Sequence, residues 1–392
     1  MNKNFNSICL IFISIWALSS CGNADQTNSA VVADTIAVPT AGIPDSASFK
    51  GDVEGKAVAL YVLKNKNGVQ VAITNYGGRI VSLMVPDKNH HFVDVVLGYD
   101  KLKSYQKKGE PFFGALIGRY GNRIAKGKFT LDGKTYQLQL NDGVNTLHGG
   151  TDGFYSKVWD AKKINDQLLE LVYFSKDGEA GYPGNLTVKV TYELTGDNEL
   201  KISYAATTDK NTIVNLTNHA YFNLNGAGDS TITDHLLMIN ADSFTPVDST
   251  LIPTGKIEKV AGTPFDFNKA ISIGERINAD NQQLKYGKGY DHNFVLRKGK
   301  GLHKVATVTS PKTGIVMDVL TEEPGLQFYS GNFLTGKDKD GKGNITYPHR
   351  SAFCLETQHF PDAPNQPAFA STELKPRTEY KTLTIYRFSV QP

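Results

Sequence analysis

Two histidines and one glutamate stand at positions where burial of a polar side chain needs an explanation. His148 lies in a tight Leu-His-Gly-Gly turn, His219 lies in a run rich in asparagine, and Glu356 follows an apolar Phe-Cys-Leu run. Burying an imidazole or a carboxylate is costly unless the group is paired. A carboxylate and an imidazole are also well suited to exchanging protons near neutral pH. These three residues are therefore candidates for general acid–base chemistry.

Each candidate also has an ordinary structural explanation. A histidine beside two glycines is often a hydrogen-bonded turn residue, and the asparagines around His219 could cap turns. Glu356 could form an ion pair at a strand end with Arg350 or Arg377. Taken alone, none of these residues identifies a site.

A zinc site is a further alternative, because two histidines and one glutamate are a common ligand set. The chain has no His-x-His and no His-Glu-x-x-His spacing, and the pair His90-His91 follows Asp87-Lys88-Asn89 in a sequence typical of an exposed loop. We therefore expect neither a metal nor another cofactor.

The elements that must position these residues are short alternating runs separated by turns. This spacing, without long helical periods between the runs, predicts an antiparallel sandwich or a similar all-β architecture. Short helices are expected near Lys101–Gln106 and Ile273–Asp280. The strand candidates are Ala57–Leu63, Val69–Thr74, Ile80–Val85, Phe92–Leu97, Lys128–Leu131, Lys134–Leu140, Leu168–Ser175, Leu186–Leu194, Leu200–Thr207, Ala306–Ser310, Ile315–Leu320, Gln327–Gly331, Ser351–Thr357 and Thr382–Val390.

The composition is typical of a soluble globular protein. Among 392 residues, 40% are hydrophobic and 21% are charged, and the net charge is +3. This balance, with no dense basic run, argues against a nucleic-acid partner. The charged segment Lys337–Gly343 reads as a solvated turn.

The first residues predict export. The apolar run Ser7–Leu18 has the length of a signal-peptide core, and it ends in Leu-Ser-Ser-Cys, which looks like a bacterial lipoprotein processing site at Cys21. We therefore expect a signal peptide over 1–20 and a periplasmic or outer-membrane-associated lipoprotein, with an ordinary signal peptide as the alternative.

The rest of the chain divides at about residue 48. Residues 21–48 are rich in small and polar residues and predict a lipid-anchored flexible tether, and residues 49–392 predict one folded domain. If Cys21 carries lipid and Cys9 leaves with the signal peptide, Cys354 has no disulfide partner. We expect Cys354 to be a small buried residue.

Six segments, in chain order, resemble the aldose 1-epimerase (galactose mutarotase) family. The Asn-Leu-Thr-Asn-His-Ala-Tyr-Phe-Asn-Leu segment is ten residues long, and together the six make a far more specific signal than any short motif. They are Gly118–Gly127, Leu147–Gly150, Asn215–Leu224, Tyr290–Phe294, Gln327–Asn332 and Leu355–Asn365.

The resemblance implies a large antiparallel β-sandwich, the galactose mutarotase-like supersandwich, with an open sugar cleft. It implies that Glu356 is the catalytic base and His219 the catalytic acid. It also implies that the substrate is a free aldose such as galactose or glucose. The positions that match sugar-binding residues of the family are Asn122, Arg123, His148, Tyr221, Asp291 and Gln327.

The residue types suit the chemistry of interconverting α and β anomers. Ring opening removes the proton of the C1 hydroxyl and delivers a proton to the ring oxygen, and closure reverses both transfers. Glu356 must be ionised to accept a proton, and His219 should be cationic or held by a neighbour that favours the cation.

Two other functions remain open. A non-catalytic sugar-binding lipoprotein could use the same fold. A glycoside hydrolase would need a second catalytic carboxylate, for which Asp291 is the candidate.

Overall fold

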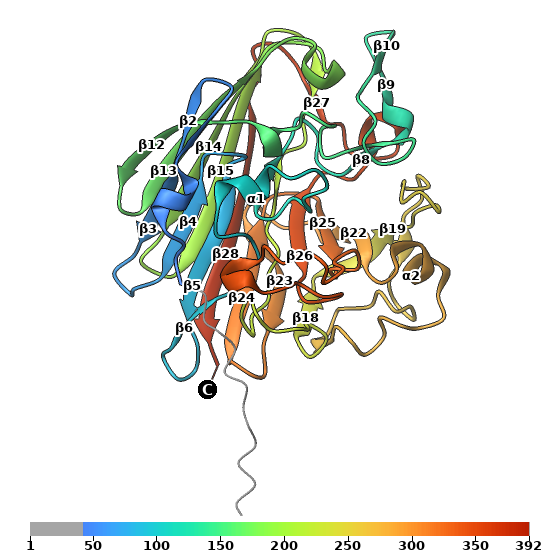
Figure 1. Cartoon of the computed structure of the whole chain (residues 1–392). Helices are drawn as coiled ribbons and strands as arrows, with labels where there is room; N and C mark the ends of the chain where they lie inside the picture. Colours follow the sequence, from blue (N-terminus) through green and yellow to red (C-terminus); the bar gives the residue numbers. More distant parts are fainter. Residues whose placement is uncertain (1–41, 392) are drawn as a thin grey trace, which may run out of the picture. The chain divides into compact units, whose positions relative to one another are not determined.

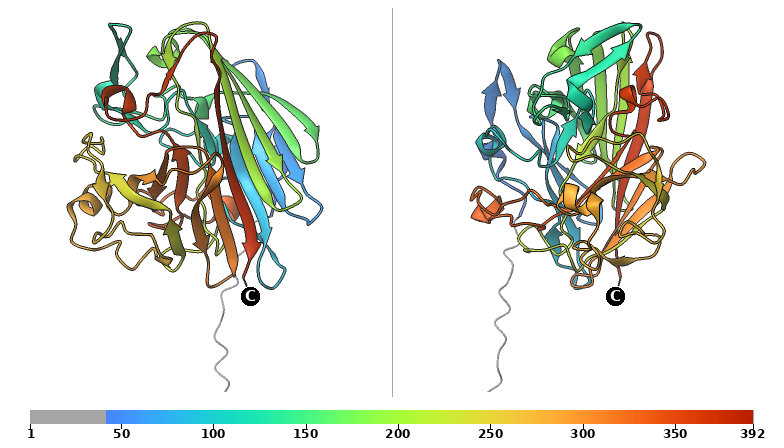
Figure 2. Two further views of the ribbon diagram at one scale, coloured as in Figure 1. Left: turned by 180° about the vertical axis from the view of Figure 1, so that it is seen from behind. Right: turned by 90° about the vertical axis from the view of Figure 1, so that its right-hand side faces the viewer.

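The longest strands lie side by side in one antiparallel sheet (Figures 1 and 2) of the computed structural model, which describes residues 42–391. Side chains of β14 and β15 alternate between buried and more accessible positions, which is the pattern of a sheet with one face against a core. In spatial order the strands are β12 (Asp160–Asn165), β13 (Leu168–Ser175), β14 (Leu186–Leu194), β15 (Glu199–Thr208), β28 (Tyr380–Val390), β24 (Ile315–Thr321), β23 (His303–Thr309), β18 (Leu236–Ile239) and β21 (Ile271–Ser272).

Two smaller antiparallel sheets supply the strands that face this large sheet. In the four-stranded sheet, β5 is buried at every position but its last, so both of its faces are covered. This sheet contains β3 (Leu60–Lys64), β4 (Gln70–Thr74), β5 (Arg79–Pro86) and β6 (Phe92–Asp94). The five-stranded sheet contains, in order, β20 (Glu258–Lys259), β19 (Ala241–Thr245), β22 (Asp291–Leu296), β25 (Gly325–Tyr329) and β26 (Cys354–Gln358).

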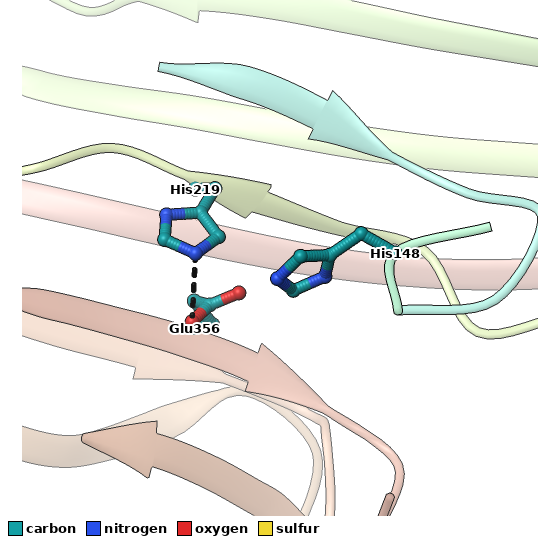
Figure 3. A group of neighbouring side chains, drawn as sticks. All are labelled: His148, His219 and Glu356. Carbon is teal, nitrogen blue, oxygen red and sulfur yellow. Dashed lines mark ion pairs between the residues drawn. The ribbon is translucent and has the colours of Figure 1, made fainter. Parts of the chain in front are cut away.

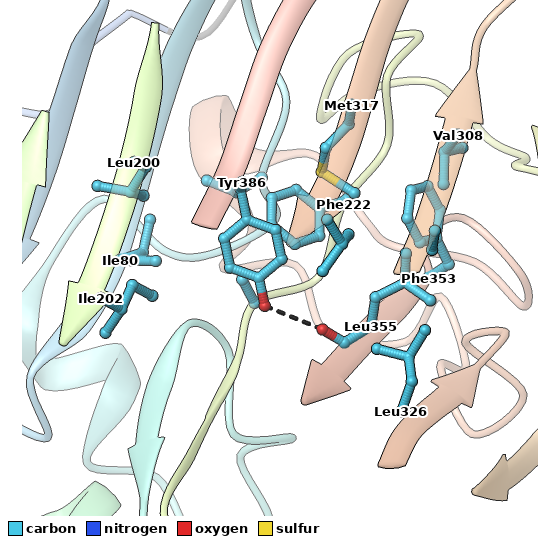
Figure 4. Packing of buried hydrophobic residues seen from close by; sticks show 14 of the residues in the cluster. Ile80, Leu200, Ile202, Phe222, Val308, Met317, Leu326, Phe353, Leu355 and Tyr386 are labelled. Atoms are coloured by element: carbon cyan, nitrogen blue, oxygen red, sulfur yellow. Dashed lines mark hydrogen bonds between the residues drawn. The ribbon is translucent and has the colours of Figure 1, made fainter. Parts of the chain in front are cut away.

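One hydrophobic core joins all three sheets. Figure 4 shows Ile80 of β5 beside Leu200 and Ile202 of β15, and Leu326 and Leu355 on the side of the five-stranded sheet. The Tyr386 hydroxyl of β28 donates a hydrogen bond of 2.9 Å to the carbonyl oxygen of Leu355. The large sheet is thereby fixed to the strand that carries Glu356.

Short strand pairs and turns complete the described chain. The pairs are β1 (Gly51–Val53) with β2 (Lys56–Val58), β7 (Ala115–Ile117) with β17 (Thr217–His219), β8 (Arg123–Ile124) with β11 (Thr146–Leu147), β9 (Lys128–Leu131) with β10 (Lys134–Gln137), and β16 (Thr212–Ile213) with β27 (Glu373–Leu374). The two α-helices among residues 42–391 are α1 (Leu102–Tyr105) and α2 (Gln282–Gly287). The 3-10 helices there are Ser46–Phe49, Ala125–Gly127, Phe154–Ser156, Glu179–Gly181, Lys342–Asn344 and Ala363–Asn365.

The predicted all-β antiparallel sandwich is confirmed, as is the short helix near residue 103. The helix predicted over Ile273–Asp280 is wrong, because this segment forms turns. The amides of Ile273 and Gly274 donate to the carbonyl oxygens of His235 and Thr233 instead of bonding within a helix. The helix α2 begins later, after Asn281, whose side chain caps it.

The predicted signal peptide over 1–20 and the lipidated Cys21 lie outside the described residues. The predicted tether over 21–48 also lies outside them up to residue 41, and its last three residues take part in the 3-10 helix Ser46–Phe49. The described residues belong to one compact unit. None of the helices in this part of the chain has the length and apolar character needed to cross a bilayer.

The segment Lys337–Gly343 is not simply a solvated turn, because Lys342 is fully buried. Its ammonium donates to Asp94 Oδ2 at 2.5 Å and to the carbonyl oxygens of Val96 at 2.6 Å and Val81 at 2.9 Å. These three acceptors match the three donors of an ammonium group. The buried lysine therefore fastens a charged loop to the four-stranded sheet.

Replacing Lys342 with Met should lower the free energy of unfolding by about 3–5 kcal/mol, because the Asp94 carboxylate would stay buried without its counter-ion. Urea unfolding followed through the fluorescence of the buried Trp159 measures this change. The matched control is Lys339→Met in the exposed part of the same loop, expected to change stability by less than about 0.5 kcal/mol. Equal unfolding curves for the two variants would contradict the structural role of Lys342.

Candidate active site

The predicted site residues converge on a cavity of about 300 Å³. Strands β8, β17, β22 and β26 supply part of its wall, and the loop before β7 supplies another part. The lining side chains include Glu110, Phe112, Asn122, Arg123, His148, His219, Tyr221, Asp291, Tyr329, Phe333 and Glu356. Figure 3 shows the carboxylate and the two imidazoles turned toward the same space.

Glu356 lies in the middle of β26, an entirely buried strand. Its side chain is only 2% exposed, and its Oε2 atom has no hydrogen-bond partner among residues 42–391. The neighbouring strand places Gln327 directly opposite Glu356 in register. A buried carboxylate oxygen left free in this way is available to accept a proton or a hydroxyl hydrogen bond from a ligand.

His219 reaches the cavity from β17, which pairs with β7 so that His219 lies opposite Ala115. Its Nε2 atom lies 3.6 Å from Glu356 Oε1. The ring stacks on Tyr221 at 5.0 Å between centroids, which fixes its plane. An imidazole and a carboxylate thus face each other across a short gap within a buried wall.

His148 follows the pair of β8 and β11 and has a left-handed backbone, with φ of 52°. The amide of Asn122 donates to His148 Nδ1 at 3.2 Å, so the proton of the neutral ring resides on Nε2. The next residue must be glycine, because a Cβ on Gly149 would lie 2.0 Å from the carbonyl oxygen of Gly118. The turn therefore presents His148 as a fixed hydrogen-bond donor.

The three side chains His148, His219 and Glu356 are also spaced as metal ligands, with one donor atom of each within 4.8 Å of the others. A metal needs an imidazole nitrogen with a free lone pair. The Asn122 amide already occupies the Nδ1 lone pair of His148 and leaves a proton on Nε2. The hydrogen bonding therefore fits a ligand that accepts hydrogen bonds better than a cation.

Arg123, Asp291 and Gln327 form a polar network beside this group. Gln327 Nε2 donates to Asp291 Oδ1 at 2.7 Å, and Arg123 NH1 lies 3.8 Å from Asp291 Oδ2. Arg123 also donates to Asp142 Oδ2 at 2.8 Å. Gln327 Oε1 is buried without a partner among the described residues.

Sequence reasoning did not identify the loop that carries Phe112. The Phe112 ring packs edge-on against His148 at 4.9 Å and lies 5.9 Å from the ring of His219. The loop is held by Glu110, which pairs with the buried Arg79 at 2.9 Å. The sequence signal in this loop is the Pro111-Phe112 pair, which is typical of a rigid apolar turn. Nothing in its spacing links this pair to His148 or His219.

Burial sets the protonation of the pair. Burial and the charge of Asp291 raise the pKa of Glu356 well above 4.5, against the opposing charge of Arg123. Burial and the charges of Arg79 and Arg123 lower the pKa of His219 to about 3. The protein alone therefore favours a neutral His219 and not the cation expected from the sequence.

Cys354 is buried as predicted, but it is also a neighbour of the candidate acid. Its Sγ atom lies 3.5 Å from Nδ1 of His219. The sequence signal for this contact is the spacing of two between Cys354 and Glu356, which puts both side chains on one face of a strand.

The structure brings seven of the eight predicted site residues to the cavity wall, namely Asn122, Arg123, His148, His219, Tyr221, Asp291 and Glu356. Gln327 lies behind these residues and is linked to the cavity wall by the hydrogen bond that it donates to Asp291. The roles assigned to these residues remain predictions.

Comparison with known proteins gives a consistent result. The aldose 1-epimerase family model matches residues 59–387. The galactose mutarotase of Sus scrofa is 48% identical over 322 residues, which cover 82% of this chain and 92% of that protein. The aldose 1-epimerase of Escherichia coli (strain K12) is 41% identical over 338 residues, which cover 86% of this chain and 96% of that protein.

Solved structures agree with the sequence matches. The aldose epimerase homologue of C. elegans has a TM-score of 0.79 at 30% identity, and the match covers 86% of this chain and all of that one. The galactose 1-epimerase of Lactobacillus acidophilus NCFM has a TM-score of 0.77 at 30% identity, covering 88% of this chain and 98% of that one.

These relatives overturn the predicted localisation. The prediction of an exported periplasmic or outer-membrane-associated lipoprotein depended on the first 21 residues, which lie outside the matched segment 59–387. The matched segment is shared with galactose mutarotases of Sus scrofa, Bos taurus and Homo sapiens, organisms that have neither a periplasm nor a bacterial outer membrane. The prediction is therefore wrong, because a short apolar run and one cysteine are a weaker signal than a match along most of the chain.

The electrostatic account of the cavity predicts opposite effects for two variants. Asp291→Asn removes a negative charge that disfavours the Glu356 carboxylate, so it should lower the pKa of Glu356. Arg123→Met removes a positive charge and should raise it. A ¹³C NMR titration of the glutamate side chains measures both pKa values against the unmodified protein. Shifts of the same sign in the two variants would rule out this charge arrangement.

Proposed function

Because the chain belongs to the aldose 1-epimerase family, we propose that this cavity is its active site, with Glu356 as the base and His219 as the acid. Membership makes the protein an isomerase that interconverts the α and β anomers of free aldoses such as galactose and glucose. Its partner is accordingly a small aldose. We also infer that residues 49–392 form one catalytic domain, because a single core joins strands from β3 to β28.

The observation that carries the proposal is the 3.6 Å approach of His219 Nε2 to Glu356 Oε1. In a cyclic aldose the C1 hydroxyl oxygen and the ring oxygen are bonded to the same carbon. An acid and a base that serve these two oxygens must therefore converge on a very small volume. The pair in the cavity wall satisfies this requirement.

Ring opening then runs between the two side chains. A carboxylate oxygen of Glu356 takes the proton of the C1 hydroxyl, a carbonyl forms at C1, and the bond from C1 to the ring oxygen breaks. His219 Nε2 gives its proton to the ring oxygen as the electron pair arrives there. Rotation about the bond between C1 and C2 followed by the reverse transfers yields the other anomer.

The burial of both groups strengthens the pair for this work. A carboxylate that is poorly solvated is a stronger base, and an imidazolium that is poorly solvated is a stronger acid. The ionised pair and the neutral pair contain the same number of protons, so reaching the working state requires only a transfer of one proton from Glu356 to His219. Hydroxyl groups of the bound sugar help to stabilise the ionised form.

The surrounding polar residues suit the recognition of hydroxyl groups. We propose that Arg123, Asn122, Asp291, Gln327 and Tyr221 bind and orient the sugar. The only cationic side chain among the residues of the proposed site is that of Arg123. It already forms ion pairs with two carboxylates, those of Asp142 and Asp291.

We propose that His148 donates from Nε2 to an oxygen at the reacting end of the sugar.

The charges of Asp291 and Glu356 would repel a phosphate group. A free aldose is therefore the substrate that fits, and a sugar phosphate does not.

The activity can be tested by following the optical rotation of freshly dissolved α-D-galactose or α-D-glucose. The protein should bring the rotation to equilibrium faster than buffer alone, and Glu356→Gln should lower kcat by about 10²–10⁴-fold because the amide cannot accept the C1 proton. Binding of the sugar, measured by calorimetry, should persist in this variant.

The control is Glu322→Gln at an exposed glutamate, which should keep full activity. If the wild-type protein bound sugar but mutarotation ran no faster than in buffer alone, the result would favour the non-catalytic alternative. A Glu356→Gln variant with a near-normal rate would remove Glu356 from the role of base.

The protonation of the pair predicts the pH–rate profile. The working pair, with Glu356 ionised and His219 protonated, holds one proton in total, and so does the resting pair, in which burial keeps that proton on Glu356. We therefore expect kcat/KM to fall as the pH rises through the raised pKa of Glu356, where the pair loses this proton, and to fall on the acidic side only near the low pKa of His219, about 3. Initial rates from about pH 4 to about pH 9, corrected for the spontaneous reaction, define the profile. A rate that declines as the pH drops from about 7 to about 5 would contradict the shared proton.

A further inference from the structure

Both ring nitrogens of His219 meet side chains of the same strand. Cys354 and Glu356 are two residues apart in β26, so they project from one face. Cys354 Sγ lies 3.5 Å from Nδ1 of His219, and Glu356 Oε1 lies 3.6 Å from Nε2. Within residues 42–391, no other side chain forms a hydrogen bond with Nδ1.

We propose that the Cys354 thiol is a positioning residue that holds the Nδ1 edge of His219 throughout the reaction, so that Nε2 stays directed at the sugar. The proposal rests on the proposed role of His219 as the acid. Cys354 itself neither touches the reacting atoms nor exchanges a proton with them.

The reaction takes His219 through two states that both need an acceptor at Nδ1. The imidazolium carries protons on Nδ1 and Nε2. After Nε2 has protonated the ring oxygen, the proton on Nδ1 remains, and Nε2 has the lone pair that recovers the proton on closure. A sulfur atom beside Nδ1 accepts this hydrogen bond in both states.

The thiol also suits the protein before the sugar binds. Burial then favours the neutral ring, and the S–H group can turn to donate to an unprotonated Nδ1. A backbone carbonyl could only accept at this position, whereas a thiol can accept or donate. Burial and the charges of Glu356 and Asp291 raise the pKa of the Cys354 thiol well above 9.0, so the proton stays on sulfur.

The weakness of a thiol as an acceptor is part of the argument. A carboxylate beside Nδ1 would stabilise the imidazolium and raise the pKa of His219, making it a weaker acid. Sulfur orients the ring with little stabilisation of the cation. Cys354 thus orients the ring of His219, and Glu356 controls its charge.

Three variants test the proposal by polarimetry. Cys354→Val keeps an apolar side chain of similar size but removes the hydrogen bond, and it should lower kcat about fivefold while KM stays nearly constant. Cys354→Ser retains a group that donates and accepts, so it should keep kcat within about twofold of the wild type. The matched control is Thr357→Val, which removes a buried hydroxyl from the opposite face of β26, where it bonds Thr384, and should leave kcat unchanged.

A second readout separates orientation from packing. In ¹⁵N-detected spectra of labelled histidine, Nδ1 of His219 should change its chemical shift in Cys354→Val and return toward the wild-type value in Cys354→Ser. An unchanged Nδ1 signal in Cys354→Val would overturn the proposal whether or not kcat falls. A changed signal with an unaltered kcat would overturn it too.

The controls also distinguish this proposal from the proposed function. If the wild-type protein failed to accelerate mutarotation, the proposed function would fail while the NMR experiment could still detect the contact between Cys354 and His219. If His219→Gln retained a near-normal rate, the assignment of the acid would fail, and the role of Cys354 would fail with it.

Discussion

A carboxyl group and an imidazole that face each other in a buried wall must either both be neutral or balance each other's charge, because little water is present to solvate an ion. His219 and Glu356 meet this condition across 3.6 Å, and much of the surrounding architecture keeps that distance fixed. The strand of Glu356 is tied to the large sheet by the hydroxyl of Tyr386, and the strand of His219 is paired with β7. The sandwich therefore serves chiefly as a rigid frame for two short strands.

The same requirement recurs wherever the protein buries charge. Lys342 has three acceptors around its ammonium, and Arg79 is paired with Glu110 behind the loop of Phe112. Arg119 donates to the carbonyl oxygens of Ser175, Lys176 and Pro183. By contrast, Oε2 of Glu356 is buried at the cavity wall without a hydrogen-bond partner among residues 42–391. A ligand in the cavity can supply that partner.

Much of the frame could be predicted from sequence, and the reasons are local. The strands Lys128–Leu131, Leu168–Ser175 and Leu186–Leu194 were predicted with their observed bounds, because alternation and turn residues define them. The three-residue strand β17 has no such pattern, since all its positions are buried. It was not among the predicted strands, although His219 within it was singled out by its residue type and by the family motif.

Long-range contacts explain most of the remaining differences. The segment predicted as a helix over Ile273–Asp280 is held in turns by carbonyl groups of a distant segment. The burial of Lys342 depends on Asp94, which is far away in sequence and carries no local signal. The site residues were recognisable through short motifs, but the convergence of three separate strand pairs on one cavity depends on how the sheets pack.

The spacing of Cys354 and Glu356 shows how such a contact can nevertheless leave a mark in the sequence. Residues two apart in a strand share one face, and an imidazole lying across that face can meet one of them with each nitrogen. A different spacing in a regular strand would turn one partner away from the ring, or move it too far along the strand. The short Cys-Leu-Glu run is therefore constrained by the geometry of a histidine on another strand, and its apolar middle residue is free to enter the core. In the proposed mechanism, one strand both supplies the base and orients the acid.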